Sequence, residues 1–181
     1  MKAKQIGFQL LQRLYKPRYL DVTSPTSIST EISWRQLGDQ NSGITDELGL
    51  SFNYLNQEVS FNEEIAWNYA ANGKLWTYNL NYFEYLSNPE IRDDLKLSTM
   101  RDFYAKRFTL IEGMEPYPIS LRNINWIKFC FASGKREFDS FIYSQATLLS
   151  KSFEYHLMGN HLLENAFSLL FAAYYFKDMT F

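Results

Sequence analysis

The residues best suited to chemistry stand at the start of a predicted helix late in the sequence. Asn160 and His161 lie side by side where a turn meets the apolar run HLLENAFSLLFAAYYF. Asparagine is a preferred N-terminal capping residue, and capping alone would explain Asn160. The pair also places an amide donor and a titratable imidazole at the positive end of a helix dipole. Such a position favours binding of a carboxylate.

The polar side chains of this helix form one narrow stripe. His161, Glu164, Asn165 and Ser168 follow the i, i+3, i+4, i+7 spacing of a single helix face, and most other positions up to Phe176 are apolar. We expect the stripe, Asn165 included, to face a polar cleft. The alternatives are a solvent-facing edge or an internal hydrogen-bond network. A second histidine, His156, precedes the helix by about one turn. It is a candidate for substrate binding, although a lone histidine more often has a structural role.

Two upstream segments offer side chains that could hold a sugar. The segment WTYNLNYFEYL places Tyr78 and Tyr82 four residues apart, so that their flat rings share one helix face and could stack on a sugar. Packing in the core is an equal alternative. In PYPISLR, Tyr117 and Arg122 are candidate cleft residues, because arginine can bind a carboxylate or sulfate through two parallel hydrogen bonds. A surface salt bridge is the competing interpretation for Arg122.

The hydrophobic pattern predicts a mainly α protein with a small N-terminal β-hairpin. Residues 1–20 have the pattern of a short amphipathic helix, residues 21–46 that of an irregular connection, and residues 51–62 that of two strands turning at Asn56 and Gln57. Helical periodicity follows, with stops at proline and glycine. The predicted helices cover residues 76–86, 90–108, 118–134, 138–154 and 161–176. Short turns between them predict antiparallel hairpins, and we divide the chain into residues 1–75 and a helical part, 76–181.

Composition excludes several classes of protein. The 181 residues are 46% hydrophobic and 21% charged, as in ordinary globular proteins, and an aromatic fraction of 18% suits large interfaces and sugar rings. The net charge is −2 and no basic run exceeds Lys106 and Arg107, so a nucleic-acid partner is not expected. The lone Cys130 lies in an apolar pattern typical of a buried inert thiol. We expect no metal and no cofactor.

Membrane and export signals are weak in the sequence. The first twenty residues are interrupted by Gln9, Gln12 and Arg13, so they lack the apolar core of a signal peptide. No run approaches the roughly 18 apolar residues of a membrane span. We therefore expect no membrane partner and a cytoplasmic location, with the periplasm as the alternative.

Four segments together resemble a known enzyme family. FEYHLMGNHLLENAFSLLFAAYYF is similar to the signature of heparinase II/III-type polysaccharide lyases. Three upstream segments agree in order and rough spacing: SFNYLNQEVSF with IAWN, then LWTYNLNYFEYL, then EPYPISLRNINWIKF. The resemblance extends over residues 51–176. Ala66 and Asn81 depart from it, because family members often have an acidic residue and a histidine at these positions.

The resemblance implies a fold and an activity. The fold would be the front part of an incomplete α/α toroid of antiparallel helix hairpins. The activity would be β-elimination in a uronate-containing acidic polysaccharide such as a glycosaminoglycan or alginate. Asn160 matches the asparagine that neutralises the substrate carboxylate, and His161 matches a histidine that shares this role or acts as base. The family's acid, a tyrosine, and a further histidine would lie beyond Phe181.

We therefore expect an N-terminal, C-terminally truncated fragment of a lyase, inactive alone. The apolar face of its last helix would be covered by the missing C-terminal half or by another chain. Two alternatives belong to other classes of protein. One is a non-catalytic carbohydrate-binding module, and the other is a helical module that binds another protein.

Overall fold

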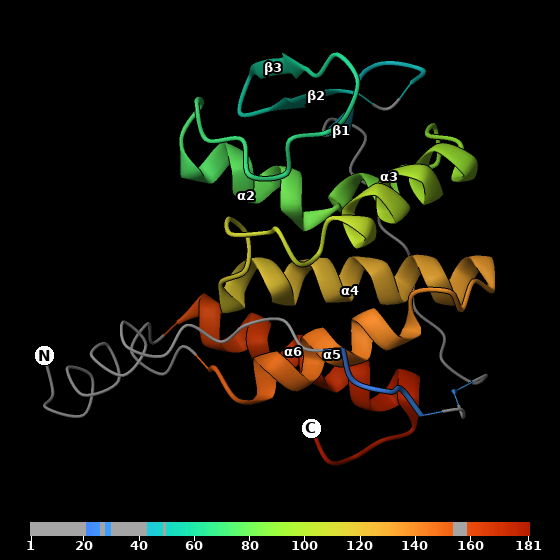
Figure 1. Cartoon of the computed structure of the whole chain (residues 1–181). Helices are drawn as coiled ribbons and strands as arrows, with labels where there is room; N and C mark the ends of the chain where they lie inside the picture. The colour runs from blue at the N-terminus through green and yellow to red at the C-terminus, as the bar shows by residue number, and fades with distance from the viewer. Residues whose placement is uncertain (1–20, 26–27, 30–42, 49, 154–158) are drawn as a thin grey trace, which may run out of the picture.

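The computed structural model describes residues 21–25, 28–29, 43–48, 50–153 and 159–181. The predicted first helix and His156 lie outside the described residues. The described part is mainly helical with a small antiparallel sheet, as the sequence predicts. Viewed as in Figure 1, the sheet lies at the top, α2 and α3 lie beneath it, α4 crosses the middle, and α5 and α6 lie at the bottom.

The sheet contains the predicted hairpin and one additional short strand. The strands are β1 (Gly43–Ile44), β2 (Ser51–Tyr54) and β3 (Gln57–Ser60), paired antiparallel in that order. Leu55 and Asn56 form the turn between β2 and β3, with φ angles of 55° and 58°. Two consecutive positive φ angles are those of a type I′ turn, which matches the right-handed twist of the strands. The turn is one residue earlier than predicted.

Five α-helices follow the sheet among the described residues. They are α2 (Lys74–Tyr82), α3 (Asp93–Ala105), α4 (Pro116–Ser133), α5 (Asp139–Ser150) and α6 (Asn160–Phe176), with a 3₁₀ helix, η1 (Glu84–Ser87), after α2. Pro116 and Pro118 lie in the first turn of α4, where a missing N–H leaves no hydrogen bond unmade. Gly134 ends the same helix with φ 67°, as predicted.

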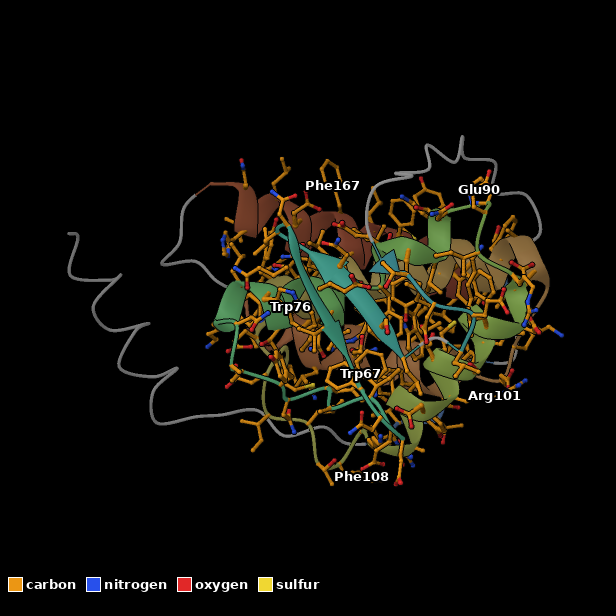
Figure 2. The ribbon with its side chains drawn as sticks, turned by 90° about the horizontal axis from the view of Figure 1, so that it is seen from above. Trp67, Trp76, Glu90, Arg101, Phe108 and Phe167 are labelled. Carbon is orange, nitrogen blue, oxygen red and sulfur yellow. The ribbon has the colours of Figure 1, made fainter. Side chains whose placement is uncertain are left out.

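The predicted helix over residues 76–86 is broken at Phe83. This residue has φ 59°, a left-handed conformation that is rare for a large side chain. Packing explains it, because the buried Phe83 ring is stacked on Trp67 with centroids 5.1 Å apart and meets Phe103 edge-on, also at 5.1 Å. Figure 2 shows Trp67 below the strands of the sheet. The indole N–H of Trp67 donates to Asp102 of α3. This aromatic cluster, which also includes Trp126 of α4, fixes α2, α3 and α4 together.

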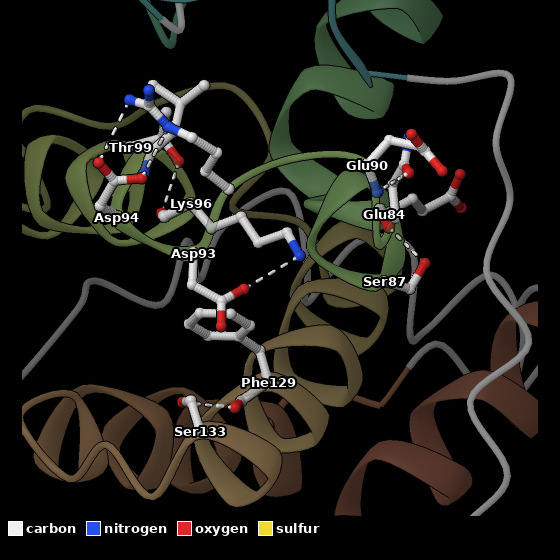
Figure 3. A network of polar contacts seen from close by, with 12 residues as sticks. Glu84, Ser87, Glu90, Asp93, Asp94, Lys96, Thr99, Phe129 and Ser133 are labelled. Atoms are coloured by element: carbon white, nitrogen blue, oxygen red, sulfur yellow. Dashed lines mark hydrogen bonds and ion pairs between the residues drawn. The ribbon is translucent and has the colours of Figure 1, made fainter.

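A buried lysine joins α3 to the C-terminal half of α4. Lys96 is 5% exposed, and its ammonium group lies 3.3 Å from the Asp93 carboxylate and 5.7 Å from the centre of the Phe129 ring. Figure 3 shows the lysine extending toward Asp93 above that ring. The ion pair and the cation–π contact together allow a charged group to be buried at this helix junction.

Helix α6 packs with the later half of its polar stripe, Asn165 and Ser168, facing inward. Asn165 and Ser168 are fully buried, and the Asn165 side-chain amide donates to Ser120 Oγ of α4 at 2.9 Å. Small side chains at Ser168 and Ala172 allow α6 to approach α4 closely. The opposite face is apolar and exposed: Leu163, Phe167, Leu170 and Tyr174 retain 52%, 43%, 47% and 57% of their accessible surface. Figure 2 shows Phe167 at the rim of the molecule.

The chain should unfold at alkaline pH. Burial raises the pKa of Tyr54, Tyr82, Tyr85 and Tyr175 well above the ordinary value of 10.0. A raised pKa means that unfolding releases protons above pH 10, so the stability these groups contribute is complete below that pH and falls above it. Arg122 and Lys128 have lowered pKa values and act in the opposite direction, but the tyrosines with raised pKa values outnumber them. We expect a cooperative loss of helical circular dichroism between about pH 10 and 12, coincident with tyrosinate absorbance. Gradual ionisation of these tyrosines before unfolding would contradict their burial.

In the part of the chain that the structure describes, no helix combines the length and the apolar character that crossing a bilayer requires.

Candidate functional site

The start of α6 is open to solvent at Asn160. Gly159 is the N-cap residue, with φ 142°, and Asn160 is the first residue of the helix. The predicted capping role of Asn160 is therefore wrong, since the N-cap position is one residue earlier. Asn160 is exposed, and its side chain makes no hydrogen bond to the described residues. Its amide is thus available to a ligand at the positive end of a helix of 17 residues.

Four of the predicted site residues form a continuous row of rings. The His161 imidazole is stacked on Tyr117, with centroids 4.2 Å apart and planes 29° apart. Tyr117 meets Tyr82 edge-on at 6.0 Å, and Tyr82 lies 6.4 Å from Tyr78. The row therefore joins α6, the first turn of α4, and α2. We refer to Tyr78, Tyr82, Tyr117 and His161 as the ring row.

The relative direction of α4 and α6 places the ring row at one end of the helical layer. Tyr117 contacts His161, Ser120 bonds to Asn165, and Lys128 lies 5.6 Å from the ring of Phe171. Residue numbers increase together along both helices, so α4 and α6 are parallel. Their N-termini therefore lie at the same end, and the positive ends of two helix dipoles meet beside the ring row.

Charged groups border the ring row. Lys74 Nζ lies 2.6 Å from Glu115 Oε1 and 5.3 Å from the centre of the Tyr78 ring. The Glu115 carboxylate raises the Lys74 pKa. Burial raises the pKa of Tyr117, and the negative charges of Glu164 and then Glu84 raise it further. The phenols therefore remain protonated donors at neutral pH.

Chemically, this end of the molecule combines three elements. The Asn160 amide could donate to a carboxylate without itself needing a proton. The imidazole of His161 could bind the same carboxylate when charged or accept a proton when neutral. The partly exposed rings of Tyr78 and Tyr117 could support the apolar face of a sugar. Tyr82 is 6% exposed and mainly positions Tyr117.

Arg122 is an internal residue and not a group facing a cleft. Its side chain is completely buried, and its Nε donates to Gln145 Oε1 at 2.7 Å. One terminal nitrogen donates to the carbonyl oxygens of Gly113 and Asn81 at 3.0 and 3.3 Å. The guanidinium also lies over the Phe103 ring, 4.8 Å from its centre. Burial lowers the pKa of Arg122 to about 9. Arg122 therefore neither faces a cleft, where it could bind a carboxylate, nor forms a surface salt bridge. Its buried hydrogen bonds, which we call the Arg122 clamp, connect α4 to α5 and to the loop at Gly113.

Asn165 is also an internal residue. Its buried bond to Ser120 corresponds to the internal hydrogen-bond alternative, so the expectation of a polar cleft does not hold at Asn165 and Ser168. The reason is that a stripe of small polar side chains lets two helices approach more closely than leucine or phenylalanine would. The predicted His156 lies outside the described residues.

Sequence reasoning missed the charged border of the ring row. Glu115 directly precedes Pro116, a position that identifies the residue before a helix, and Lys74 is four residues before Tyr78 on the same face of α2. These spacings could have placed both groups near the tyrosines. The contact between Lys74 and Glu115 depends on how α2 packs against α4, and the local sequence does not predict that packing. Among the described residues no group of three or more His, Cys, Asp or Glu side chains could hold a metal ion.

Comparison of the chain with models of protein families, with curated proteins and with solved structures finds no match.

Proposed function

We propose that these helices form one wall of the active site of a polysaccharide lyase that cleaves a uronate-containing chain by β-elimination. The observation that carries the proposal is the exposed Asn160 beside His161, whose ring continues a row of tyrosines. His161, which matches a family histidine, meets three tyrosines that were selected separately as possible sugar-binding residues, although the four come from three separate helices.

The proposed chemistry needs a donor at the substrate carboxylate. A proton on the carbon next to that carboxylate is too weakly acidic to leave while the carboxylate keeps its full negative charge. Hydrogen bonds from the Asn160 amide, together with two converging helix dipoles, would stabilise the developing enolate. His161 would share this neutralisation or take the proton. A tyrosine acid and a further histidine would have to come from residues outside this chain.

The helix directions are compatible with an incomplete α/α toroid. In such a fold, hairpins alternate so that every second helix is parallel and lines one side. Parallel α4 and α6 with α5 between them in sequence follow this rule. The exposed apolar residues of α6 would then be covered by the next helix pair, from the C-terminal half of the toroid or from another chain.

Two other functions are favoured by single observations. The ring row alone would suit a carbohydrate-binding module without catalysis. The exposed apolar face of α6 alone would suit a helical module that binds another protein.

The decisive experiment measures binding and elimination separately. Unsulfated uronate oligosaccharides are titrated calorimetrically into the chain, and polysaccharide digests by the longest form that the reading frame encodes are monitored for the ultraviolet absorbance of unsaturated uronate. We expect saturable binding to the chain and elimination by the longest form. Binding without unsaturated product favours the binding module. The absence of any glycan binding overturns both carbohydrate functions.

Replacing Tyr117 by alanine should weaken oligosaccharide binding. The substitution removes the stacking surface and releases the His161 ring, with an expected loss of about 0.5–1.5 kcal/mol, or roughly 2- to 13-fold in Kd. Tyr174→Ala is the matched control, because Tyr174 is 57% exposed near the other end of α6. Equal effects of both substitutions would contradict a specific role for the ring row.

A further inference from the structure

We infer that Asn165 and Ser120 are positioning residues that fix the register of α6 against α4 and thereby hold the His161 ring on Tyr117. The inference rests on the proposed function, and it adds two residues that act on the ring row from inside the molecule. Both side chains are completely buried, so neither contacts the sugar directly. They set the distance between the imidazole and the phenol ring that supports the sugar.

A chain of two hydrogen bonds runs from α6 to the first residue of α4. The Asn165 side-chain amide donates to Ser120 Oγ at 2.9 Å, and Ser120 Oγ donates to the carbonyl oxygen of Pro116 at 2.8 Å. A hydroxyl group has one hydrogen to donate, so Ser120 meets α6 as an acceptor and requires a donor there. Pro116 begins α4 and directly precedes Tyr117. The chain of bonds therefore connects α6 to the backbone that carries the Tyr117 ring.

The hydrogen bond and the ring stack lie one helical turn apart on both helices. Ser120 is three residues after Tyr117 in α4, and Asn165 is four residues after His161 in α6. Because three or four residues make one turn, both pairs belong to the same two facing sides of the parallel helices. Sliding α6 by one turn, about 5.4 Å, would separate both pairs at once. The register that makes the hydrogen bond is therefore also the register that stacks the rings, whose centres are 4.2 Å apart.

Burial makes this hydrogen bond selective for one register. Leaving a buried polar group without a partner disfavours a competing register by roughly 5- to 150-fold. Hydrophobic packing is non-directional, so by itself it does not choose between registers. The next polar side chains along the two helices add no such selection, because the Asn123 amide and Ser168 Oγ are buried without a hydrogen-bond partner among the described residues. The bond between Asn165 and Ser120 therefore supplies the directional contact.

Nuclear magnetic resonance of the full chain tests the inference without a ligand. In the wild type, the Tyr117 ring should shift the His161 ring protons upfield and show nuclear Overhauser effects to them, and His161→Gln identifies these signals. Asn165→Leu nearly keeps the side-chain volume but removes the donor, and Ser120→Ala removes the acceptor. Each should move the His161 signals toward random-coil values. The double variant should show no larger change than either single variant, because the two side chains act as one unit.

Oligosaccharide binding tests the connection to function. In calorimetry with an unsulfated uronate oligosaccharide, Asn165→Leu and Ser120→Ala should each weaken binding by roughly 2- to 13-fold, the loss expected for Tyr117→Ala. The double variant should again resemble the single variants. Wild-type affinity in both single variants would overturn the positioning role.

Tyr175→Phe is the matched control. The Tyr175 hydroxyl donates to Asp139 Oδ1 at 2.8 Å, in a buried hydrogen bond between α6 and α5 near the other end of α6. Its loss should lower the urea midpoint of unfolding, as the loss of the Asn165 bond should, but it should leave the His161 signals and the binding unchanged. Circular dichroism establishes that each variant is folded, and Ser120→Ala carries the test if Asn165→Leu does not fold.

The two readouts separate failure of the inference from failure of the proposed function. His161 signals that keep their wild-type positions in Asn165→Leu and Ser120→Ala, or that move equally in Tyr175→Phe, overturn the inference and leave the proposed function intact. Absence of oligosaccharide binding by the wild-type chain overturns the proposed function and, with it, the role of the pair in that function.

Discussion

Replacing Arg122 by methionine is expected to lower the free energy of unfolding by about 2–4 kcal/mol. Methionine fills much of the same space, but it leaves the carbonyls of Gly113 and Asn81 and the Gln145 side chain without their donor. Each buried acceptor that loses its partner costs about 1–3 kcal/mol. The total stays below a simple sum because burying the guanidinium is itself unfavourable, as the lowered pKa indicates.

Urea denaturation followed by circular dichroism measures this effect. Arg122→Lys should also destabilise the fold, by about 1–3 kcal/mol, because a single ammonium group cannot reproduce the hydrogen bonds that the planar guanidinium donates in several directions. Arg101→Met is the control, because Arg101 forms an exposed ion pair with Glu137 and its replacement should leave the stability nearly unchanged. An Arg122→Met change no larger than that of the control would contradict the clamp.

If the proposed lyase function holds, replacing Asn160 by alanine in the longest form that the reading frame encodes should reduce the rate of elimination by about 100- to 1,000-fold. This is the usual effect of removing one donor that stabilises a developing oxyanion. Stability should change by less than about 0.5 kcal/mol, because Asn160 is exposed and makes no hydrogen bond to the described residues.

Asn160→Asp separates function from folding more sharply. The carboxylate has nearly the same shape as the amide, but it cannot donate and it repels the substrate carboxylate. At the first position of α6 a negative charge should stabilise the helix by about 0.3–1 kcal/mol. A more stable and inactive variant is therefore expected. Full activity in either Asn160 variant would contradict the assignment of this residue.

The sequence was most informative where local rules decide the structure. Two prolines at the start of α4 and Gly134 at its end follow from backbone preferences. The hairpin was also predicted, although its turn at Leu55 and Asn56 lies one residue earlier than expected. The approximate helix positions follow from the spacing of apolar residues. The same spacing placed Tyr78 and Tyr82 on one face of α2.

The sequence was least informative where contacts between distant segments decide. Phe83 adopts a left-handed conformation because its ring packs against Trp67, Phe103 and Trp126. The local sequence pattern does not predict these tertiary contacts. Arg122 has the composition of a ligand-binding residue, yet its acceptors come from segments 9, 23 and 41 residues away in the sequence. Whether a polar side chain points to a cleft or to a neighbouring helix depends on that kind of long-range contact.

The stacking of His161 on Tyr117 was likewise beyond the sequence pattern. Residues 117 and 161 were selected separately, one together with Arg122 as a candidate cleft residue and the other for its neighbour Asn160. Only the parallel packing of α4 and α6 brings them to 4.2 Å. The parallel packing of α4 and α6 therefore brings two separately predicted residues into one candidate site.

We propose that Asn160 and His161 bind the carboxylate of a sugar that the ring row supports. The most direct measurement is a nuclear magnetic resonance titration of the chain with an unsulfated uronate oligosaccharide and, in parallel, with the same oligosaccharide after reduction of its carboxyl groups to alcohols. The Asn160 amide and His161 ring signals should shift strongly and saturably with the acid form and much less with the reduced form. Equal shifts with both forms, or shifts confined to other parts of the chain, would contradict the claim.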